Sequence, residues 1–127
     1  MLLAAQVECS RPRPLNRIVM PRPPEVWLDV FIELLPTEQG GRKYPLDLCN
    51  DNPGQYRPHF RVIGGSGEML GVAFMDGPDD PILPGGCTNA TVKCLYPGVS
   101  YAELVEGAKF EILEGPYVVG RGVVTKR

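Results

Sequence analysis

Few side chains in this sequence could carry out catalysis. His59 is the only histidine, so a nucleophile–base pair of the usual kind would have to include it. No GxSxG or SxxK motif surrounds a candidate nucleophile, and a lone histidine more often makes one satisfied hydrogen bond than it acts in catalysis. The glycine-rich stretch GGSGEMLG is not followed by a lysine-serine or lysine-threonine step, so it is not a phosphate loop. We therefore predict no catalytic residues and no enzyme activity.

Candidate metal ligands are also sparse. The acidic stretch DGPDD, residues 76–80, lacks the spacing of an EF-hand loop and is expected to be a solvated turn. The four cysteines, Cys9, Cys49, Cys87 and Cys94, form no CxxC pair, which argues against a zinc ribbon. The offset between Cys87 and Cys94 is odd, which places them on opposite faces of one strand and argues against a mutual disulfide. We predict no metal site, no cofactor and reduced thiols.

The beginning of the chain indicates where the protein is located. MLLAAQVECS is apolar at its start, but it has no basic n-region and is too short to span a bilayer. We therefore expect no signal peptide, no membrane association and a cytoplasmic location. On that basis the glycosylation sequon at Asn89 is a chance match.

Length and composition favour one all-β domain. The chain has 127 residues, of which 43% are hydrophobic, enough for a buried core. Its 15 glycines and 14 prolines are spread without a period, and they separate short apolar runs in the way that turns separate strands. The net charge of −2 lacks the basic surplus of a free-standing nucleic-acid binder. Any contact with nucleic acid would have to be local.

Hydrophobic alternation predicts six strands and almost no helix. The first strand alternates Val26, Leu28, Val30 and Ile32 with a second face that also carries bulky apolar groups, so we expect partial cover on both faces. The stretch YAELVEG, residues 101–107, has the composition of a single helical turn. Gly71 inside the third strand predicts a bulge or a bend. The predicted strands are residues 26–34, 59–63, 68–75, 87–96, 108–115 and 116–127.

Two segments do not fit a minimal barrel or sandwich. Residues 1–26 contain RPRP and PRPP and are predicted to be an extended N-terminal extension, because proline removes donors and fixes φ. Residues 40–60, GGRKYPLDLCNDNPGQYRPHF, form a connection far longer than the two to five residues that a hairpin needs. Its length suggests that this connection contacts something else.

The order of motifs from residue 27 to residue 127 resembles the third domain, a C-terminal β-barrel, of the bacterial translation elongation factor Tu. The stretches that carry the resemblance are EQGGRKYP, GQYRPHF, LPGGCTNATV and EGAKFEILEGPYVVGRGVVTKR. The resemblance implies a six-stranded antiparallel Greek-key barrel. In that factor the barrel packs on the GTPase domain, contacts the T stem of aminoacyl-tRNA and receives the nucleotide exchange factor. This sequence contains neither GxxxxGK[ST] nor NKxD, so we expect no nucleotide binding.

The resemblance also implies binding residues, with departures from the family pattern. Leu70 replaces a threonine, Tyr96 a basic residue and Pro116 the second glycine of a pair. At two of the implied positions this chain has a different residue, with lysine in place of histidine at 43 and histidine in place of glutamine at 59. The residues that the resemblance implies for binding RNA or a partner are Arg42, Lys43, Tyr56, Arg57, His59 and Gly115. Arg42 with Lys43 would supply a few phosphate contacts, which implies weak and salt-sensitive RNA binding.

Three functions remain open, because a fold does not determine a function. The first is a non-catalytic module that docks a translation-related protein, for instance as a mimic of the factor or as an immunity-type protein that binds a toxin. The second is a translation accessory domain that binds tRNA or another RNA weakly. The third is a self-associating structural barrel, in which an exposed Trp27 or Tyr96 is buried in a homo-oligomer. The acidic balance and the lost hydroxyl and basic side chain favour the first.

Overall fold

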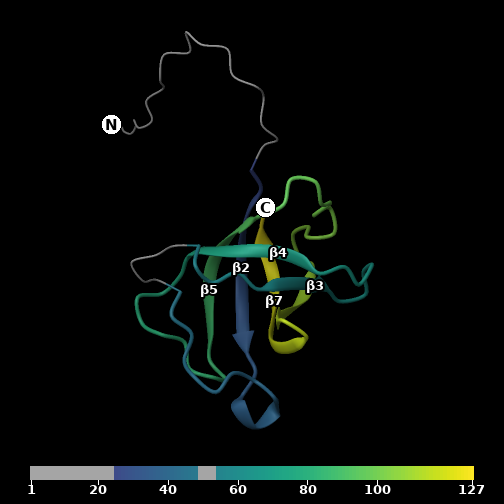
Figure 1. Cartoon of the computed structure of the whole chain (residues 1–127). Coiled ribbons are helices and arrows are strands. Elements are labelled where there is room, and N and C mark those ends of the chain that lie inside the picture. Colours follow the sequence, from purple (N-terminus) through teal and green to yellow (C-terminus); the bar gives the residue numbers. More distant parts are fainter. Residues whose placement is uncertain (1–24, 49–53) are drawn as a thin grey trace, which may run out of the picture.

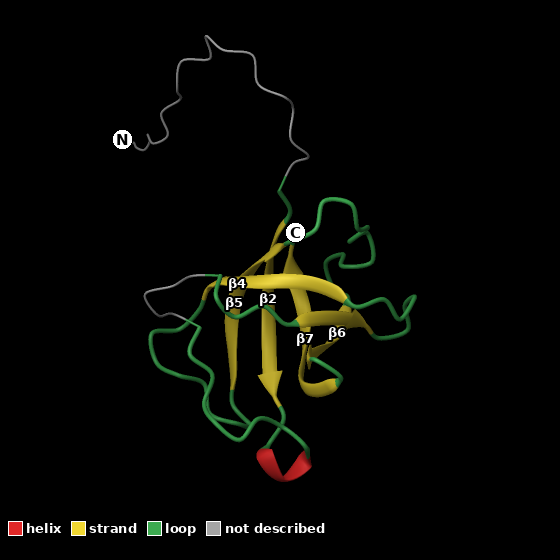
Figure 2. Cartoon of the chain, in the orientation of Figure 1, coloured by secondary structure: helices red, strands yellow, loops and turns green. Residues whose placement is uncertain are grey.

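A computed structural model describes residues 25–48 and 54–127, and nearly all regular structure in these residues is strand (Figure 1, Figure 2). Most of the predicted N-terminal extension, residues 1–24, and residues 49–53 of the long connection lie outside the described residues. The elements are β2 (Trp27–Leu34), the 3-10 turn η2 (Thr37–Gln39), β3 (His59–Val62), β4 (Leu70–Asp76), β5 (Cys87–Cys94), β6 (Lys109–Glu114) and β7 (Tyr117–Lys126). No helix among the described residues has the length and apolar character needed to cross a bilayer.

The strands form a closed antiparallel barrel, which confirms the predicted fold class. Around the barrel the order is β2-β5-β4-β3-β6-β7, and β2 pairs with β7 to complete the ring. The three strands β3, β4 and β5 are neighbours in chain order, and β2, joined to them by the long connection, returns beside β5. This is the Greek-key arrangement of four strands. The six paired interfaces give all described strands a partner on both sides.

The core lies inside this ring and is built by alternate side chains. In β2, burial alternates without a break, and Leu28, Val30 and Ile32 are fully buried. The outer face of this strand is only partly covered, as expected, since Trp27 and Phe31 are 43% and 37% exposed. Closure of the barrel buries only the inner face of each strand, so bulky outer side chains stay in contact with solvent.

Aromatic rings fill the middle of the barrel. Phe60 stacks on Phe110 with ring centroids 4.0 Å apart, and it meets Phe74 edge to face at 5.9 Å. The inner face of β7 makes room for these rings with glycine. A Cβ at Gly122 would lie 2.7 Å from the ring of Phe110 and 2.6 Å from the backbone oxygen of Phe31. Only glycine therefore lets β7 approach both β2 and the rings.

Two local expectations are wrong in detail. Residues 101–107 form two turns and no helix, because Tyr101 and Leu104 are both buried and hold the chain against the core. Gly71 marks no bulge, since the irregularity in the β4–β5 pairing lies between Phe74 and Asp76. A Cβ at Gly71 would lie 2.4 Å from the ring of Tyr96, so this glycine is needed for a close ring contact.

The described cysteines are consistent with the predicted thiols. Cys87 is exposed, Cys94 is half-buried against the core, and neither forms a disulfide. Cys9 and Cys49 lie outside the described residues.

Candidate functional site

The long connection between β2 and β3 packs onto the barrel through its described residues. Leu46 and Ile82 exchange two backbone hydrogen bonds of 2.9 and 2.8 Å. Leu46 and Leu48 are 4% and 3% exposed and belong to the core cluster. The first half of the connection is therefore held by the same hydrophobic burial that holds the strands.

The second half of the connection extends the hydrogen bonding of β4. The backbone N–H of Gly54 donates to the carbonyl of Phe74 at 2.8 Å, and the N–H of Phe74 donates to the carbonyl of Tyr56 at 3.0 Å. The N–H of Val72 donates to the carbonyl of Pro58 at 3.1 Å. The Tyr56 ring packs against Phe74, with centroids 5.4 Å apart. This backbone pairing places the Tyr56 hydroxyl near the end of β6.

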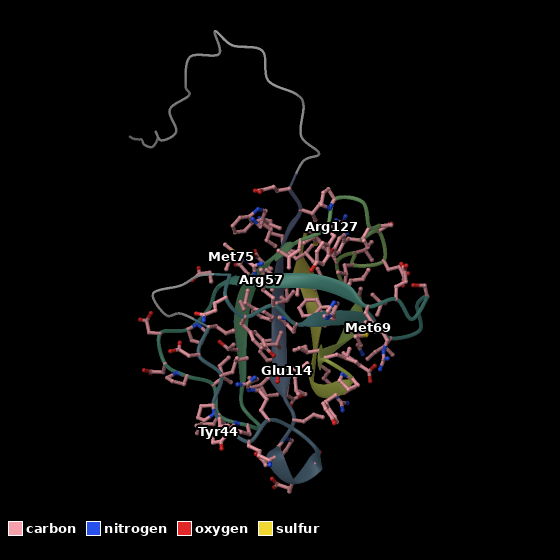
Figure 3. All side chains as sticks on the ribbon, viewed as in Figure 1. Tyr44, Arg57, Met69, Met75, Glu114 and Arg127 are labelled. Carbon is pink, nitrogen blue, oxygen red and sulfur yellow. The ribbon has the colours of Figure 1, made fainter. Side chains whose placement is uncertain are left out.

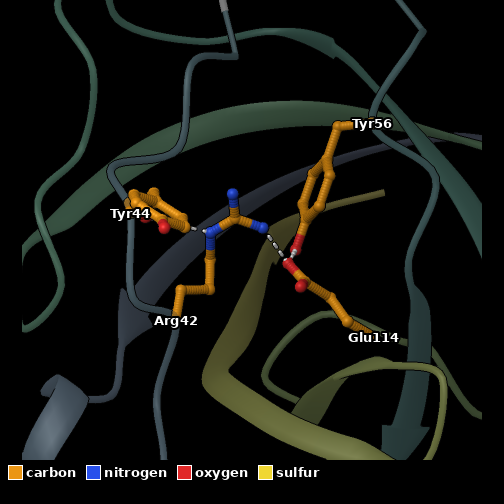
Figure 4. A network of polar contacts seen from close by, with 4 residues as sticks. All are labelled: Arg42, Tyr44, Tyr56 and Glu114. Carbon is orange, nitrogen blue, oxygen red and sulfur yellow. Dashed lines mark hydrogen bonds and ion pairs between the residues drawn. The ribbon is translucent and has the colours of Figure 1, made fainter.

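A polar network ties the two halves of the connection to β6 (Figure 4). Glu114, the last residue of β6, accepts a hydrogen bond on Oε2 from Nη1 of Arg42 and another, 2.6 Å long, from the hydroxyl of Tyr56. Arg42 also donates from Nε to the carbonyl of Tyr44 at 3.3 Å. Its guanidinium carbon lies 5.7 Å from the centroid of the Tyr56 ring, within cation–π range. One carboxylate thus joins three segments of the chain.

The electrostatics of this network keep Tyr56 protonated. Burial raises the pKa of the Tyr56 hydroxyl far above its usual value, and the neighbouring Glu114 carboxylate raises it further. The side chains of Arg42 and Glu114 keep 21% and 32% of their exposure, so the ion pair is partly shielded from water. A protonated phenol donates to the carboxylate, and the arrangement is a structural clamp with no nucleophile in it.

The other sequence-predicted residues lie outside this clamp. Lys43 is exposed on the connection next to Arg42. Arg57 is exposed and donates from Nε to the carbonyl of Gly54 at 2.7 Å. His59 opens β3, where it pairs with strands on both sides and is half-buried. Of the six predicted residues, the clamp brings together Arg42 and Tyr56.

Gly115 has a conformational role. It forms, with Pro116, the two-residue connection between β6 and β7, and its φ is 61°. Proline fixes φ near −65°, so of the turns that suit a two-residue hairpin only type II′, with glycine first, accommodates this pair. Proline at position 116, where the resemblance implies a second glycine, is therefore compatible with the hairpin.

Sequence reasoning missed Glu114, which is 72 residues away from Arg42 along the chain. A signal was present. Glu114 shares the parity of the inward-facing Phe110 and Ile112, and a charged residue at an inward position calls for a partner.

Sequence reasoning also missed two exposed phenols beside the clamp. Tyr44, whose carbonyl accepts from Arg42, is 73% exposed, and Tyr117, which pairs with Glu114 across the β6–β7 hairpin, is 71% exposed. Figure 3 places Tyr44 and Arg127 toward opposite ends of the barrel. We refer to these two exposed side chains, each next to a residue of the clamp, as the tyrosine face.

The comparison with known families adds no identification. No protein-family model matches the chain. The resemblance to the third domain of elongation factor Tu stays a prediction, and with it the binding roles that it implies. Within the described part of the chain, no three histidine, cysteine, aspartate or glutamate side chains gather in a way that would hold a metal ion.

Proposed function

We propose that this barrel is a non-catalytic protein-binding module that docks a translation-related protein through the tyrosine face. One observation carries the proposal. The arginine expected to meet a phosphate, Arg42, is bonded within the chain, while Tyr44 and Tyr117 beside it are 73% and 71% exposed. Tyrosine is enriched at protein interfaces, where it gives a large contact area at a low cost in conformational entropy.

The charged side chains near the tyrosine face favour a protein over RNA as the binding partner. Binding to phosphates requires cations that are free to replace the counterions of the nucleic acid. Arg42 would have to leave both Glu114 and the Tyr44 carbonyl to do so. Base stacking on tyrosine is ordinarily combined with a positively charged groove, whereas Tyr117 lies opposite a glutamate.

The partner class follows from the resemblance. If the four motifs reflect descent from the third domain of elongation factor Tu, the proteins that dock on that domain are the first candidates. They are its nucleotide exchange factor and its own GTPase domain. Binding either of them would make this chain a mimic of the factor.

Titration of these two purified proteins into the full chain, followed by calorimetry, tests the proposal. We expect one of them to bind, and Tyr44→Ala and Tyr117→Ala each to weaken binding by about tenfold or more, as tyrosines at interface hot spots do. Trp27→Ala is the matched control, since Trp27 is 43% exposed but lies at the far end of β2. Absence of binding to both proteins, or equal losses with all three variants, would contradict the proposal.

A parallel titration with tRNA at two salt concentrations separates the main alternative. We expect no specific complex. A salt-sensitive complex that Lys43→Ala weakens and Tyr117→Ala leaves intact would favour the RNA-binding function instead.

A further inference from the structure

A row of alternating charges crosses the outer wall of the barrel. Glu33 of β2 pairs in register with Arg121 of β7, Arg121 pairs with Glu111 of β6, and Glu111 pairs with Arg61 of β3. The neighbours of these residues along each strand face the core, so all four side chains lie on the outside. The row therefore reads minus, plus, minus, plus across four adjacent strands, about 14 Å at the usual strand spacing.

The pairing within this row is incomplete. Arg61 donates to Glu111 at 3.0 Å from Nε and 2.8 Å from Nη2, and both bonds end on Oε1. Oε2 of Glu111 accepts no bond within the described residues. Glu33 and Arg121 are exposed and, in the same part of the chain, form no ion pair, although they face each other across the strands.

We propose that this wall is the interface of a symmetric homodimer. A row that reads minus, plus, minus, plus reads plus, minus, plus, minus in reverse. A two-fold axis through its middle, between Arg121 and Glu111, therefore places every charge opposite an unlike charge of the second copy. Because the wall of a small barrel is convex, β6 and β7 meet first, and Arg121 of each copy reaches the free Oε2 of the other copy's Glu111.

Apolar side chains beside the row supply the hydrophobic part of the interface. Phe31 pairs with Val123, Val123 pairs with Lys109, and the N–H of Ile63 donates to the carbonyl of Lys109 at 2.9 Å. These residues line a groove of about 320 Å³ next to Glu33 and Arg121. Phe31 is 37% and Ile63 55% exposed, and such apolar surface beside complementary charge is typical of an association surface. This seam differs from the Trp27 or Tyr96 interface considered from the sequence.

Charge reversal tests the proposal on the full chain, with molar mass measured by light scattering across a concentration series. We expect the wild type to approach twice the monomer mass, with weaker association as salt is added. Arg121→Glu and Glu111→Arg should each raise the dimer dissociation constant by about tenfold or more, because like charges then face each other twice. Lys126→Glu on the same strand and Glu38→Arg on η2 are charge-matched controls that should leave it unchanged.

Mixing the two reversed variants gives the decisive measurement. In a heterodimer of Arg121→Glu with Glu111→Arg, both facing pairs are again unlike charges, so mixing should restore the dimer. The double variant R121E/E111R should likewise dimerise with itself. Restoration cannot arise from a variant that fails to fold.

Three results would overturn the proposal: a monomer at every concentration, a dimer insensitive to both reversals, or no restoration on mixing. No partner protein is present in this experiment. Its outcome is therefore independent of whether the tyrosine face binds a translation-related protein.

Discussion

Glu114 and Glu111 lie on the same strand and each accepts a hydrogen bond from an arginine of a distant segment, so they form a matched pair for substitution. Their surroundings differ. Glu114 also accepts the Tyr56 hydroxyl at 2.6 Å, whereas Glu111 bonds only to an arginine among the described residues. The side chains of Glu111 and its arginine are 34% and 36% exposed, so this pair is more open to water than the pair of Glu114 with Arg42 and contributes less to stability.

For the monomeric chain, we predict that Glu114→Ala lowers the free energy of unfolding by about 1.5–2 kcal/mol and Glu111→Ala by about 0.5 kcal/mol. The larger value is one charge-assisted hydrogen bond plus a partly shielded ion pair, reduced because Glu114 keeps 32% of its exposure. The difference of about 1–1.5 kcal/mol corresponds to about 4–12 °C in Tm for a domain of this size. Tyr56→Phe should cost about 1 kcal/mol alone and almost nothing in the Glu114→Ala background.

Urea denaturation measures these differences, with circular dichroism and the fluorescence of Trp27, the one tryptophan, as independent probes. The double-mutant cycle of Tyr56 with Glu114 isolates their interaction from other effects of each substitution. Equal losses for the two glutamates, or additive losses for Tyr56 and Glu114, would refute the clamp as the element that holds the connection to β6.

Three further predictions concern the scaffold. Gly122→Ala should lower the free energy of unfolding by about 2 kcal/mol, because its Cβ would overlap the backbone of β2, while Gly98→Ala, with no neighbour within 4 Å, should change it by less than about 0.5 kcal/mol in urea denaturation. Tyr101→Phe should cost about 1–2 kcal/mol in the same assay, because its buried hydroxyl donates to a carbonyl of β4 at 2.6 Å; no change would mean that water replaces this bond. Burial raises the pKa of the Cys94 thiol from 9.0 to about 11, so the folded protein holds this proton more tightly than the unfolded chain does. The stability that this difference gives is full below pH 9 and is lost as the pH rises to about 11. A pH series should therefore show a smaller decline over this window for Cys94→Ala than for the wild type, and identical declines would contradict the shift.

The strands were predictable because successive side chains of a strand point to opposite faces. Apolar residues at every second position of the sequence therefore indicate a strand. The shared face of Leu28, Val30 and Ile32 in β2 was predicted correctly from this alternation, although the alternation did not indicate which face of the strand is buried. The turns at residues 101–107 were not predicted, because local helix propensity there is overridden by the burial of Tyr101 and Leu104.

The candidate site was only partly predictable. Arg42 and Tyr56 were singled out by the resemblance and lie in an unusually long connection, but their common partner Glu114 is distant along the chain. Only the spacing of Glu114 from Phe110 and Ile112, which places it on the inward side of its strand in the sequence pattern, indicated that it needs a partner. The charge row was not visible either, since register between strands places Glu33, Arg121 and Glu111 side by side, and register depends on the pairing of the whole barrel.

The ring of strands has a consequence for recognition. Every described strand already has a neighbour on each side, so an incoming peptide finds no vacant row of main-chain donors and acceptors to extend. Any selectivity of this protein for a binding partner must then be determined by its outward-facing side chains and its loop tips. Residues at such positions can be substituted one at a time without disturbing the strands that carry them. The binding partner of the barrel can therefore change while the fold stays the same.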